Sequence, residues 1–360
     1  MAIRIEIPEG RDDLIEFVLF QDKVYEYRSA RWPANLVVQL PFLLGEGASA
    51  QGRTLRPFIA RDGDRILARA LAVWDERYNR YWNERLGHVT MFEAMPETRE
   101  AVKQMIDAAC EWLRQQGAEA ARSSYYFPTL DVSYVIDEYE SLPPMLLRQN
   151  PPYYHALLKD AGFETEKGLV DYKIEVKPEL VARYESALES ARRAGFAIVP
   201  LKDVAPARRI REFTATNNEA FKRHWGYIAA TEEENAEMFE IVGPGGALDT
   251  SVLAYRGDDP VGVLFVVPDM SSGATLSAGR ALKDSEKLNM LGIGVLESAR
   301  GRGVNLAMAS YAFLELIRRG AKYLSYTLVL DDNWPSRRTA VKLGASVCAN
   351  YLVYRRNFRA

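Results

Sequence analysis

Histidine and cysteine are scarce in this chain, with three His and two Cys among 360 residues. The two cysteines, Cys110 and Cys348, stand far apart, and no CxxC, HxxxH or HExxH spacing occurs. Structural zinc sites and disulfide frameworks need such residues clustered, so the sequence predicts no metal and no disulfide scaffold.

An excess of either charge is also missing. Lys and Arg together number 46 and Asp and Glu 49, which gives a formal net charge of −3. This balance offers no global electrostatic reason to wrap nucleic acid or to lie flat on an anionic membrane. No nucleic-acid partner is therefore expected, and any bound anion must be held by a local site.

Long apolar runs are absent as well. No window approaches 18 uninterrupted apolar residues, which predicts no transmembrane segment. The first residues, MAIRIEIPEG, indicate a short alternating strand and not a secretory signal. The simplest expectation is a cytoplasmic protein, with peripheral membrane contact and oligomeric state left open.

The chain does contain enough apolar side chain to fold. Hydrophobic residues make up 48% and aromatic residues 11% of the sequence, which excludes extended disorder. At roughly 150 residues per domain, the length predicts two domains.

Three segments of the first half recur in the second half in the same order. The matched segments are 57–75 with 251–269, 110–127 with 313–330, and 157–176 with 339–358. The first pair predicts two strands around a Gly-Asp turn, and the second predicts a helix, a glycine stop and a strand. The chain is therefore an internal duplication.

The sequence of each half predicts, in order, a hairpin, a strand, a helix, a strand, a helix and a closing pair of strands. This order makes an α/β fold of two domains, each a mixed, mostly antiparallel sheet flanked by helices. Apolar periodicity supports helices over 99–116 and 303–319. A charged amphipathic helix over 178–194 holds the boundary, which divides the chain into domains 1–180 and 181–360.

The sequence Arg-Gly-Arg-Gly-Val-Asn at 300–305 follows a strand and opens a helix. Unpaired N–H groups at a helix N-terminus attract anions, and glycines let phosphate oxygens approach the main chain. The alternative is a solvated turn with two surface arginines. At the equivalent place, 91–100, the first half has three acids and no glycine, so one half is expected to bind a pyrophosphate.

The second half resembles a GCN5-related N-acetyltransferase (GNAT) domain. The signature of that family is a strand followed by Arg/Gln-x-x-Gly-x-Gly/Ala, with a later Asn-x-Pro helix start that leads to a glycine. Residues 295–305 and 333–344 stand at those places, and the resemblance covers essentially the whole chain as a tandem pair. It implies that acetyl-CoA or a longer acyl-CoA lies in a V-shaped gap between two parallel strands.

The resemblance assigns backbone groups of the strand to the pantetheine, the loop to the pyrophosphate and a later asparagine to the thioester end. The residues so assigned are Ile293, Gly294, Val295, Arg300, Gly301, Arg302, Gly303, Val304, Asn305 and Asn333. Two positions depart from the family pattern. Asn305 replaces the last glycine, and Ala340 stands where a tyrosine often protonates the departing thiolate.

The layout also resembles a narrower bacterial group of long tandem GNAT proteins. The segment 13–32, the loop LGIGVLESARGRG and the run Asp-Asp-Asn-Trp-Pro at 331–335 carry this resemblance. The group includes acyltransferases of sphingoid-like lipid amines. The resemblance implies a role in lipid metabolism, with a lipid amine as acceptor or a long-chain acyl donor.

Acyl transfer to an amine needs a base for the nitrogen and an acid for the thiolate. The candidate bases are His224, alternatively a helix-end histidine packed on Trp225, and Asp332, alternatively a helix N-cap. The candidate acids are Tyr326, Tyr351 and Tyr354, which strand packing would equally explain.

An aromatic run follows the first hairpin, and either inter-domain packing or an acyl-chain groove would explain it. Its members are Trp74, Tyr78, Tyr81 and Trp82.

Three functions remain open. The first is an acyl-CoA-dependent N-acyltransferase with an amine-bearing small molecule or lipid as substrate. The second is a catalytically degenerate pair that binds CoA or a partner as a sensor or scaffold. The third, a transferase that uses aminoacyl-tRNA, is disfavoured by the near-neutral charge.

Overall fold

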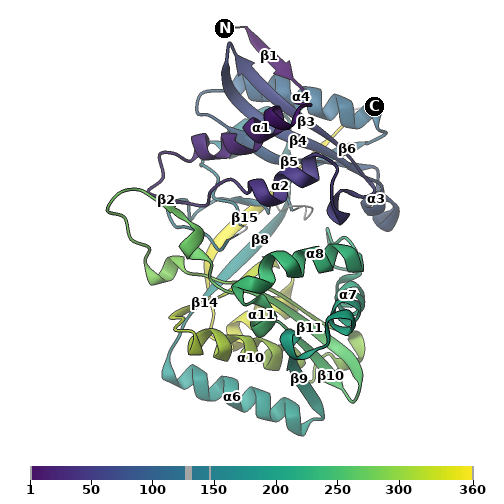
Figure 1. Ribbon diagram of the computed structural model, residues 1–360, viewed down its shortest axis with the longest axis vertical. Coiled ribbons are helices and arrows are strands. Elements are labelled where there is room, and N and C mark those ends of the chain that lie inside the picture. The colour runs from purple at the N-terminus through teal and green to yellow at the C-terminus, as the bar shows by residue number, and fades with distance from the viewer. Residues whose placement is uncertain (1, 126–131, 146, 359–360) are drawn as a thin grey trace.

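A nine-stranded mixed sheet and a four-stranded antiparallel sheet organise the protein (Figure 1). The computed structural model describes residues 2–125, 132–145 and 147–358. The strands of the large sheet are β1 (Ile3–Glu6), β3 (Arg53–Asp62), β4 (Arg65–Asp75), β5 (Leu86–Ala94), β6 (Ala120–Ser123), β7 (Tyr134–Val135), β8 (Glu164–Glu175), β14 (Tyr323–Leu330) and β15 (Ser346–Asn357). The small sheet consists of β9 (Phe196–Pro200), β10 (Val252–Arg256), β11 (Asp259–Val267) and β13 (Met290–Val295).

Helices cover the faces of both sheets. They are α1 (Arg11–Val24), α2 (Leu36–Leu43), α3 (Glu76–Trp82), α4 (Arg99–Gln115), α5 (Tyr154–Asp160), α6 (Pro178–Arg193), α7 (Pro206–Phe221), α8 (Glu232–Val242), α9 (Ala247–Thr250), α10 (Val304–Arg318) and α11 (Trp334–Lys342). A separate pair, β2 (Ala30–Arg31) with β12 (Thr275–Leu276), joins the two halves of the sequence.

The predicted duplication is confirmed element by element. Each half has a hairpin, β3–β4 and β10–β11, then a strand, a helix, a strand and a helix. The long helices α4 and α10 match the predicted ones to within one residue at each end. Each is followed by a left-handed glycine, Gly117 with φ 101° and Gly320 with φ 89°. Only glycine adopts this conformation without strain, which explains the helix stops.

The predicted closing strand pair in each half is wrong. Each half ends in one long strand, β8 or β15, and the two pair with each other across the duplication. β15 also pairs with β6 of the first half, and β8 pairs with β14 of the second. A long edge strand leaves its backbone groups unpaired, and this mutual exchange satisfies both edges. The boundary at residue 180 falls inside α6 and stays a prediction.

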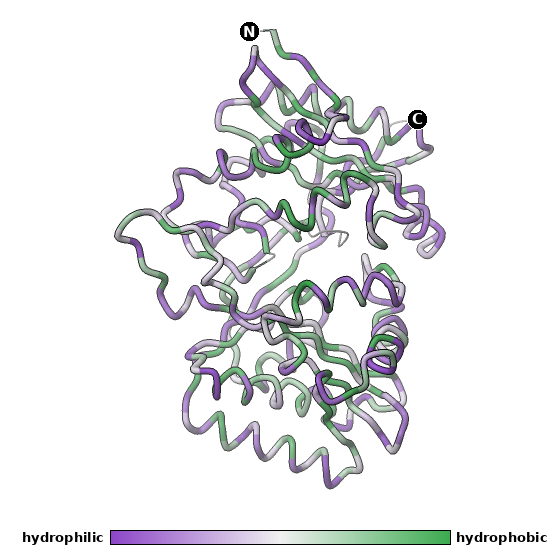
Figure 2. Tube along the Cα trace, in the orientation of Figure 1, coloured by the Kyte–Doolittle hydropathy of each residue, from purple (hydrophilic) through white to green (hydrophobic). Residues whose placement is uncertain are grey.

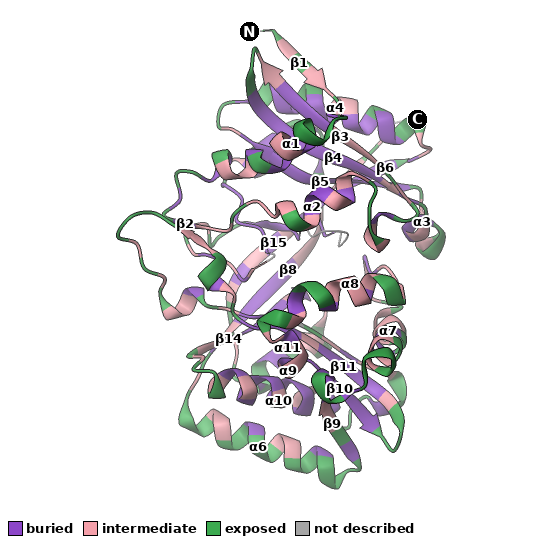
Figure 3. Ribbon diagram, in the orientation of Figure 1, coloured by how far each residue is buried: buried purple, intermediate pink, exposed green. Residues whose placement is uncertain are grey.

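The core consists of a first cluster between α4 and strands β3–β5 and a second around α10. Val102, Met105 and Ile106 of α4 are fully buried in the first, and Ala307 and Met308 of α10 in the second. Figure 3 shows the strands of the large sheet as mostly buried and α6 as largely exposed on the outside of the second half. The exposed face of α6 matches its charged, amphipathic sequence.

The strand pair β5–β6 of the first half and the equivalent pair β13–β14 of the second half differ in whether the two strands are hydrogen-bonded to each other. In the first half β5 and β6 are hydrogen-bonded in parallel over Leu86–His88 and Ala120–Arg122. In the second half β13 pairs with β11 and not with β14, although β13 and β14 lie close together. The second half therefore has a strand edge that none of the described strands occupies.

Candidate active site

The free edge of β13 is the first component of the site. Leu296 N donates to Val261 O at 2.9 Å, and alternate residues of an antiparallel strand face the same neighbour. The backbone groups of Ile293 and Val295 therefore point away from β11, toward β14. Gly294 has a different role, because a Cβ there would lie 2.7 Å from Ala220 and 2.8 Å from Phe221 of α7. Its missing side chain lets α7 pack against β13.

The loop from Arg300 to Gly303 forms the second component. Gly301 has φ 74°, and Gly303, the N-cap of α10, has φ 80°. Apart from each glycine and its two chain neighbours, no heavy atom of the described residues lies within 4 Å of a Cβ built there. Arg300 and Arg302 are exposed, and Arg300 Nε donates to Val295 O at 3.1 Å. Open space, free helix N–H groups and two cations suit a pyrophosphate.

Asn305, the departure from the family's last glycine, lies in the first turn of α10, directly after Val304, which is buried. Its Nδ2 donates to Thr339 Oγ1 of α11 at 2.9 Å. The side chain thus ties α10 to α11, and the neighbouring Ala340 is fully buried.

A cavity of about 1050 Å³ lies between the halves and reaches the β13 edge at Ile293. Much of its wall is apolar and comes from α2, α7, α8 and β11. The residues that illustrate this are Val37, Val38, Phe42, Met238, Ile241 and Phe265. Figure 2 shows α2 as a strongly apolar helix on the side of the first half that faces α8. The free strand edge therefore opens into an apolar space.

His224 lies three residues beyond the end of α7 and lines this cavity. Its Nδ1 is 3.4 Å from Tyr125 Oη of the first half, whose ring stacks on Trp225. Burial lowers the pKa of His224, which opposes protonation and keeps the imidazole neutral at pH 7. A neutral imidazole in a cavity can accept a proton.

Tyr326 and Asn333 also line the cavity, from β14 and from the start of α11. Tyr326 Oη is 2.8 Å from Ser336 Oγ, and burial raises the pKa of this phenol to about 12. It therefore stays protonated at neutral pH and can donate. Asn333 is the N-cap of α11, accepting from Ser336 N at 3.3 Å. The N-cap suggested for Asp332 is thus supplied by the next residue.

The other predicted acid and base candidates lie elsewhere. Asp332 is exposed and forms an ion pair with Lys167 Nζ at 2.5 Å. Tyr351 hydrogen-bonds Asp171, and Tyr354 Oη is 2.7 Å from His155 Nδ1. None of these three candidates lines the cavity.

Sequence reasoning missed Asp171, which controls the shape of β14. Its Oδ1 accepts from Leu328 N at 2.7 Å, at a bulge where Leu328 has φ 56° and the pairing with β8 shifts register. Burial raises the pKa of Asp171 to about 7. An aspartate within the run Leu-Val-Asp-Tyr at 169–172 was the available signal.

The first half fills the equivalent strand edge with its own side chains. Arg148 donates to Phe92 O, and Tyr153 Oη donates to Ala94 O at 2.7 Å. Ala94 N donates to Tyr154 Oη, also at 2.7 Å. These contacts occupy backbone groups of β5, whereas the equivalent strand β13 reaches the cavity at Gly292 and Ile293.

Two members of the aromatic run after the first hairpin, Tyr81 and Trp82, form contacts between the halves. Trp82 Nε1 donates to Tyr227 O and Tyr81 Oη to Lys222 O, both at 2.7 Å. None of its four members lines the cavity. The inter-domain interpretation therefore holds for Tyr81 and Trp82, whereas Trp74 packs against the core of the first half.

No protein-family model matches this chain, and no curated protein is similar enough in sequence to match it. Solved structures do match. A tandem GNAT protein from the clavulanic acid biosynthesis pathway is similar over 99% of this chain and 98% of its own, with 12% identity and a TM-score of 0.60.

A GCN5-related N-acetyltransferase from Sphaerobacter thermophilus is similar over 99% of this chain and 96% of its own, with 17% identity and a TM-score of 0.54. The third is a fungal multi-domain GH3 beta-N-acetylglucosaminidase with a GCN5-related glucosamine N-acetyltransferase region. It is similar over 98% of this chain, with 15% identity and a TM-score of 0.59, and this chain spans 38% of its length. The protein therefore has the GCN5-related N-acetyltransferase fold, in tandem.

Among residues 2–125, 132–145 and 147–358, no helix is both long and apolar enough to cross a bilayer. Within the same ranges, no group of three or more His, Cys, Asp or Glu side chains is placed to hold a metal ion.

Proposed function

We propose that this protein is an acyl-CoA-dependent N-acyltransferase with one CoA site, in its second half. The observation that carries the proposal is the free edge of β13, which continues into the Gly301–Gly303 loop and opens into the cavity. Supporting this, the same edge of the first half is occupied by Arg148, Tyr153 and Tyr154.

In this proposal the pantetheine of the acyl-CoA pairs with the backbone groups of Ile293 and Val295. Its pyrophosphate lies on the loop between Arg300 and Asn305, against the N-terminus of α10. Asn333 lies near the thioester, on the cavity wall.

The acyl chain or a lipid amine occupies the apolar cavity between the halves. Two residues of its wall, Val37 of α2 and Ile241 of α8, have exposed fractions of 82% and 53%. Exposed apolar side chains beside an apolar cavity suit a molecule with a hydrocarbon chain. We therefore propose a long-chain substrate on one or both sides of the reaction.

The proposed chemistry is one displacement at the thioester carbonyl. The amine nitrogen attacks the carbonyl carbon, the C–S bond breaks, and an amide and free CoA thiol result. An amine with a pKa near 10 costs about 4 kcal/mol to deprotonate at pH 7. The neutral His224 takes the amine proton, the thiolate takes a proton from Tyr326, and a backbone N–H of the β13 edge polarises the carbonyl. In this proposal Tyr326 supplies the proton that a tyrosine at the position of Ala340 often supplies in the GNAT family.

The test is thiol release by the purified full chain. Acetyl-CoA and palmitoyl-CoA are each supplied with a short amine, dodecylamine or sphinganine. We expect amine-dependent release of free CoA, faster with palmitoyl-CoA or with the long-chain amines. If CoA release is equally fast with short and long substrates, the proposal of a long-chain substrate is wrong. If no amine causes CoA release, the proposal of acyltransferase activity is wrong. CoA binding at micromolar concentration without turnover is the result expected of a sensor.

A further inference from the structure

The first-half wall of the cavity contains a buried cation that the acyl-transfer chemistry does not use. Arg69 of β4 lines the cavity, and only 1% of its surface is exposed. Its Nη1 donates to two carbonyl oxygens of α1, Phe17 O and, at 2.8 Å, Val18 O. Its Nε has no hydrogen-bond partner in the described part of the chain, nor does an ion pair to Arg69 occur there.

The carboxylate whose charge acts on Arg69, that of Glu93, is already engaged. Glu93 Oε2 accepts from Tyr25 Oη at 2.8 Å and from Tyr154 Oη at 2.7 Å, and its Oε1 lies 3.7 Å from Arg148 Nη2. The planar fork of Arg69 thus keeps one edge without an anion. A buried guanidinium that bonds no anion directly is costly, and a forked carboxylate is the partner that fits its geometry.

The same wall has further polar atoms without partners. Gln39 Oε1 and Gln149 Oε1 are buried, line the cavity and have no hydrogen bond in the described ranges. Buried polar atoms in proteins are nearly always hydrogen-bonded, so unmet ones in a cavity wall point to a polar group of a ligand. An amide side chain can present either its oxygen or its NH₂ to that group.

We propose that Arg69 forms an anion subsite, and that the acceptor carries a carboxylate in addition to its amine. The carboxylate pairs with the free edge of Arg69, the apolar middle of the molecule lies against α2 and α8, and the amine reaches His224. Acceptors of this class are amphoteric, with an amino group and a carboxylate separated by a hydrocarbon segment. The inference rests on the proposed acyl transfer for the role of the amine, but the subsite itself is a binding property.

The test measures binding to the full chain by calorimetry, without acyl-CoA. The probes are ω-amino carboxylic acids of about 6 to 12 carbons, each compared with the n-alkylamine of the same carbon number. A charge-assisted bidentate pair predicts that the carboxylate lowers Kd about tenfold or more for at least one chain length. No preference at any length in the wild type would overturn the proposal.

Two variants assign the preference to Arg69. Arg69→Met removes the charge, and Arg69→Lys keeps the charge but loses the fork, so both should lose most of the carboxylate preference. Arg65→Met is the matched control, because Arg65 is exposed on the same strand. A preference that persists in both Arg69 variants would overturn the assignment, and circular dichroism shows whether each variant is folded. Failure of thiol release would affect the proposed function and leave this binding result intact.

Discussion

At the scale of single residues, burial is what makes ordinary side chains suited to acyl transfer. His224 and Tyr326 line one cavity, although 102 positions separate them in the sequence. Burial lowers the pKa of the first and raises that of the second. Both shifts favour the neutral forms, which are the base and the acid that the reaction needs.

We expect His224→Gln and Tyr326→Phe each to lower kcat by about 10²-fold or more, with little change in KM for acyl-CoA. Because burial lowers the pKa of His224, wild-type kcat/KM should fall only as the pH drops through a value below 6.5. When kcat/KM is calculated from the concentration of unprotonated amine, this fall at low pH should be missing in His224→Gln.

The matched control for this prediction is His155→Gln. His155 of the first half lies outside the cavity and hydrogen-bonds Val135 O and Tyr354 Oη of β15. The His155→Gln variant should keep the wild-type kcat even if it is less stable than the wild type. An unchanged kcat in both site variants would remove His224 and Tyr326 from the mechanism.

At the scale of elements, α10 connects the Arg300–Gly303 loop to the core. Its N-terminus is open at Gly301 and Gly303, while its body packs against α6 and the small sheet. A rigid buried helix keeps its N–H groups aimed at one point, which preorganises an anion site.

Gly303→Glu should raise the Kd for CoA at least tenfold, because it places a carboxylate where the pyrophosphate is expected. Gly320→Glu is the matched control at the other end of α10, with the same left-handed strain at φ 89° and open space around it. Both variants should lose a similar amount of stability, about 1–2 kcal/mol from the strain. Equal CoA affinity in the two variants, measured by calorimetry, would rule out the loop as the phosphate site.

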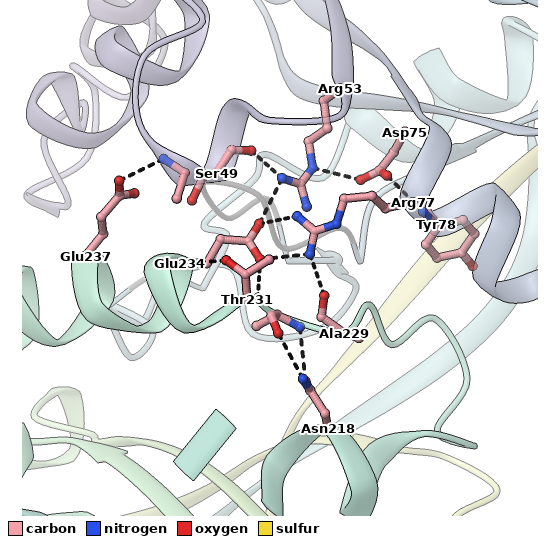
Figure 4. Close-up of polar contacts among 12 residues, drawn as sticks. Ser49, Arg53, Asp75, Arg77, Tyr78, Asn218, Ala229, Thr231, Glu234 and Glu237 are labelled. Atoms are coloured by element: carbon pink, nitrogen blue, oxygen red, sulfur yellow. Dashed lines mark hydrogen bonds and ion pairs between the residues drawn. The ribbon is translucent and has the colours of Figure 1, made fainter. Parts of the chain in front are cut away.

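At the scale of the whole molecule, an ion-pair network holds α8 against the first half and so shapes the cavity. Glu234 Oε1 accepts from Arg53 Nη1 at 3.0 Å and from Arg77 Nη1 at 2.7 Å, as Figure 4 shows. Arg53 in turn donates to Asp75 Oδ2 at 2.7 Å. The same helix contributes Glu237, whose Oε1 accepts from Ala48 N at 2.7 Å.

Glu234→Gln should destabilise the protein by about 3 kcal/mol, because Arg77 loses its carboxylate and the buried Arg53 keeps only that of Asp75. Burial alone would raise the pKa of Glu234, but its hydrogen bonds to Arg77 and Thr231 and the charge of Arg53 lower it overall. The stability that ionised Glu234 adds to the folded protein is therefore present at neutral pH and is lost as the pH falls through the lowered pKa.

Urea unfolding measures the loss of stability in Glu234→Gln. The control is Glu233→Gln, because Glu233 is an exposed neighbour on the same helix. At neutral pH the Glu234 variant should unfold at lower urea than the control, and the gap should close in acid. Equal midpoints at neutral pH would show that the network contributes nothing to the docking of the halves.

Local patterns were sufficient to predict much of the fold. The Gly-Asp hairpins, α4, α10 and their glycine stops depend on contacts between near neighbours in sequence, and all are where the sequence predicts them. The closing strands were misjudged, because their partners come from the opposite half and no local pattern specifies which edge a strand meets.

The sequence by itself determined that the chain is duplicated and that the glycine-rich loop belongs to the second half, since the backbone conformation of a loop follows from its own residues. The tertiary structure alone decided that β15 crosses into the first half, that His224 meets Tyr125, and that Arg69 faces the cavity. These arrangements depend on which distant surfaces pack together. Packing is a property of the whole set of apolar faces and strand edges, so no segment encodes it alone.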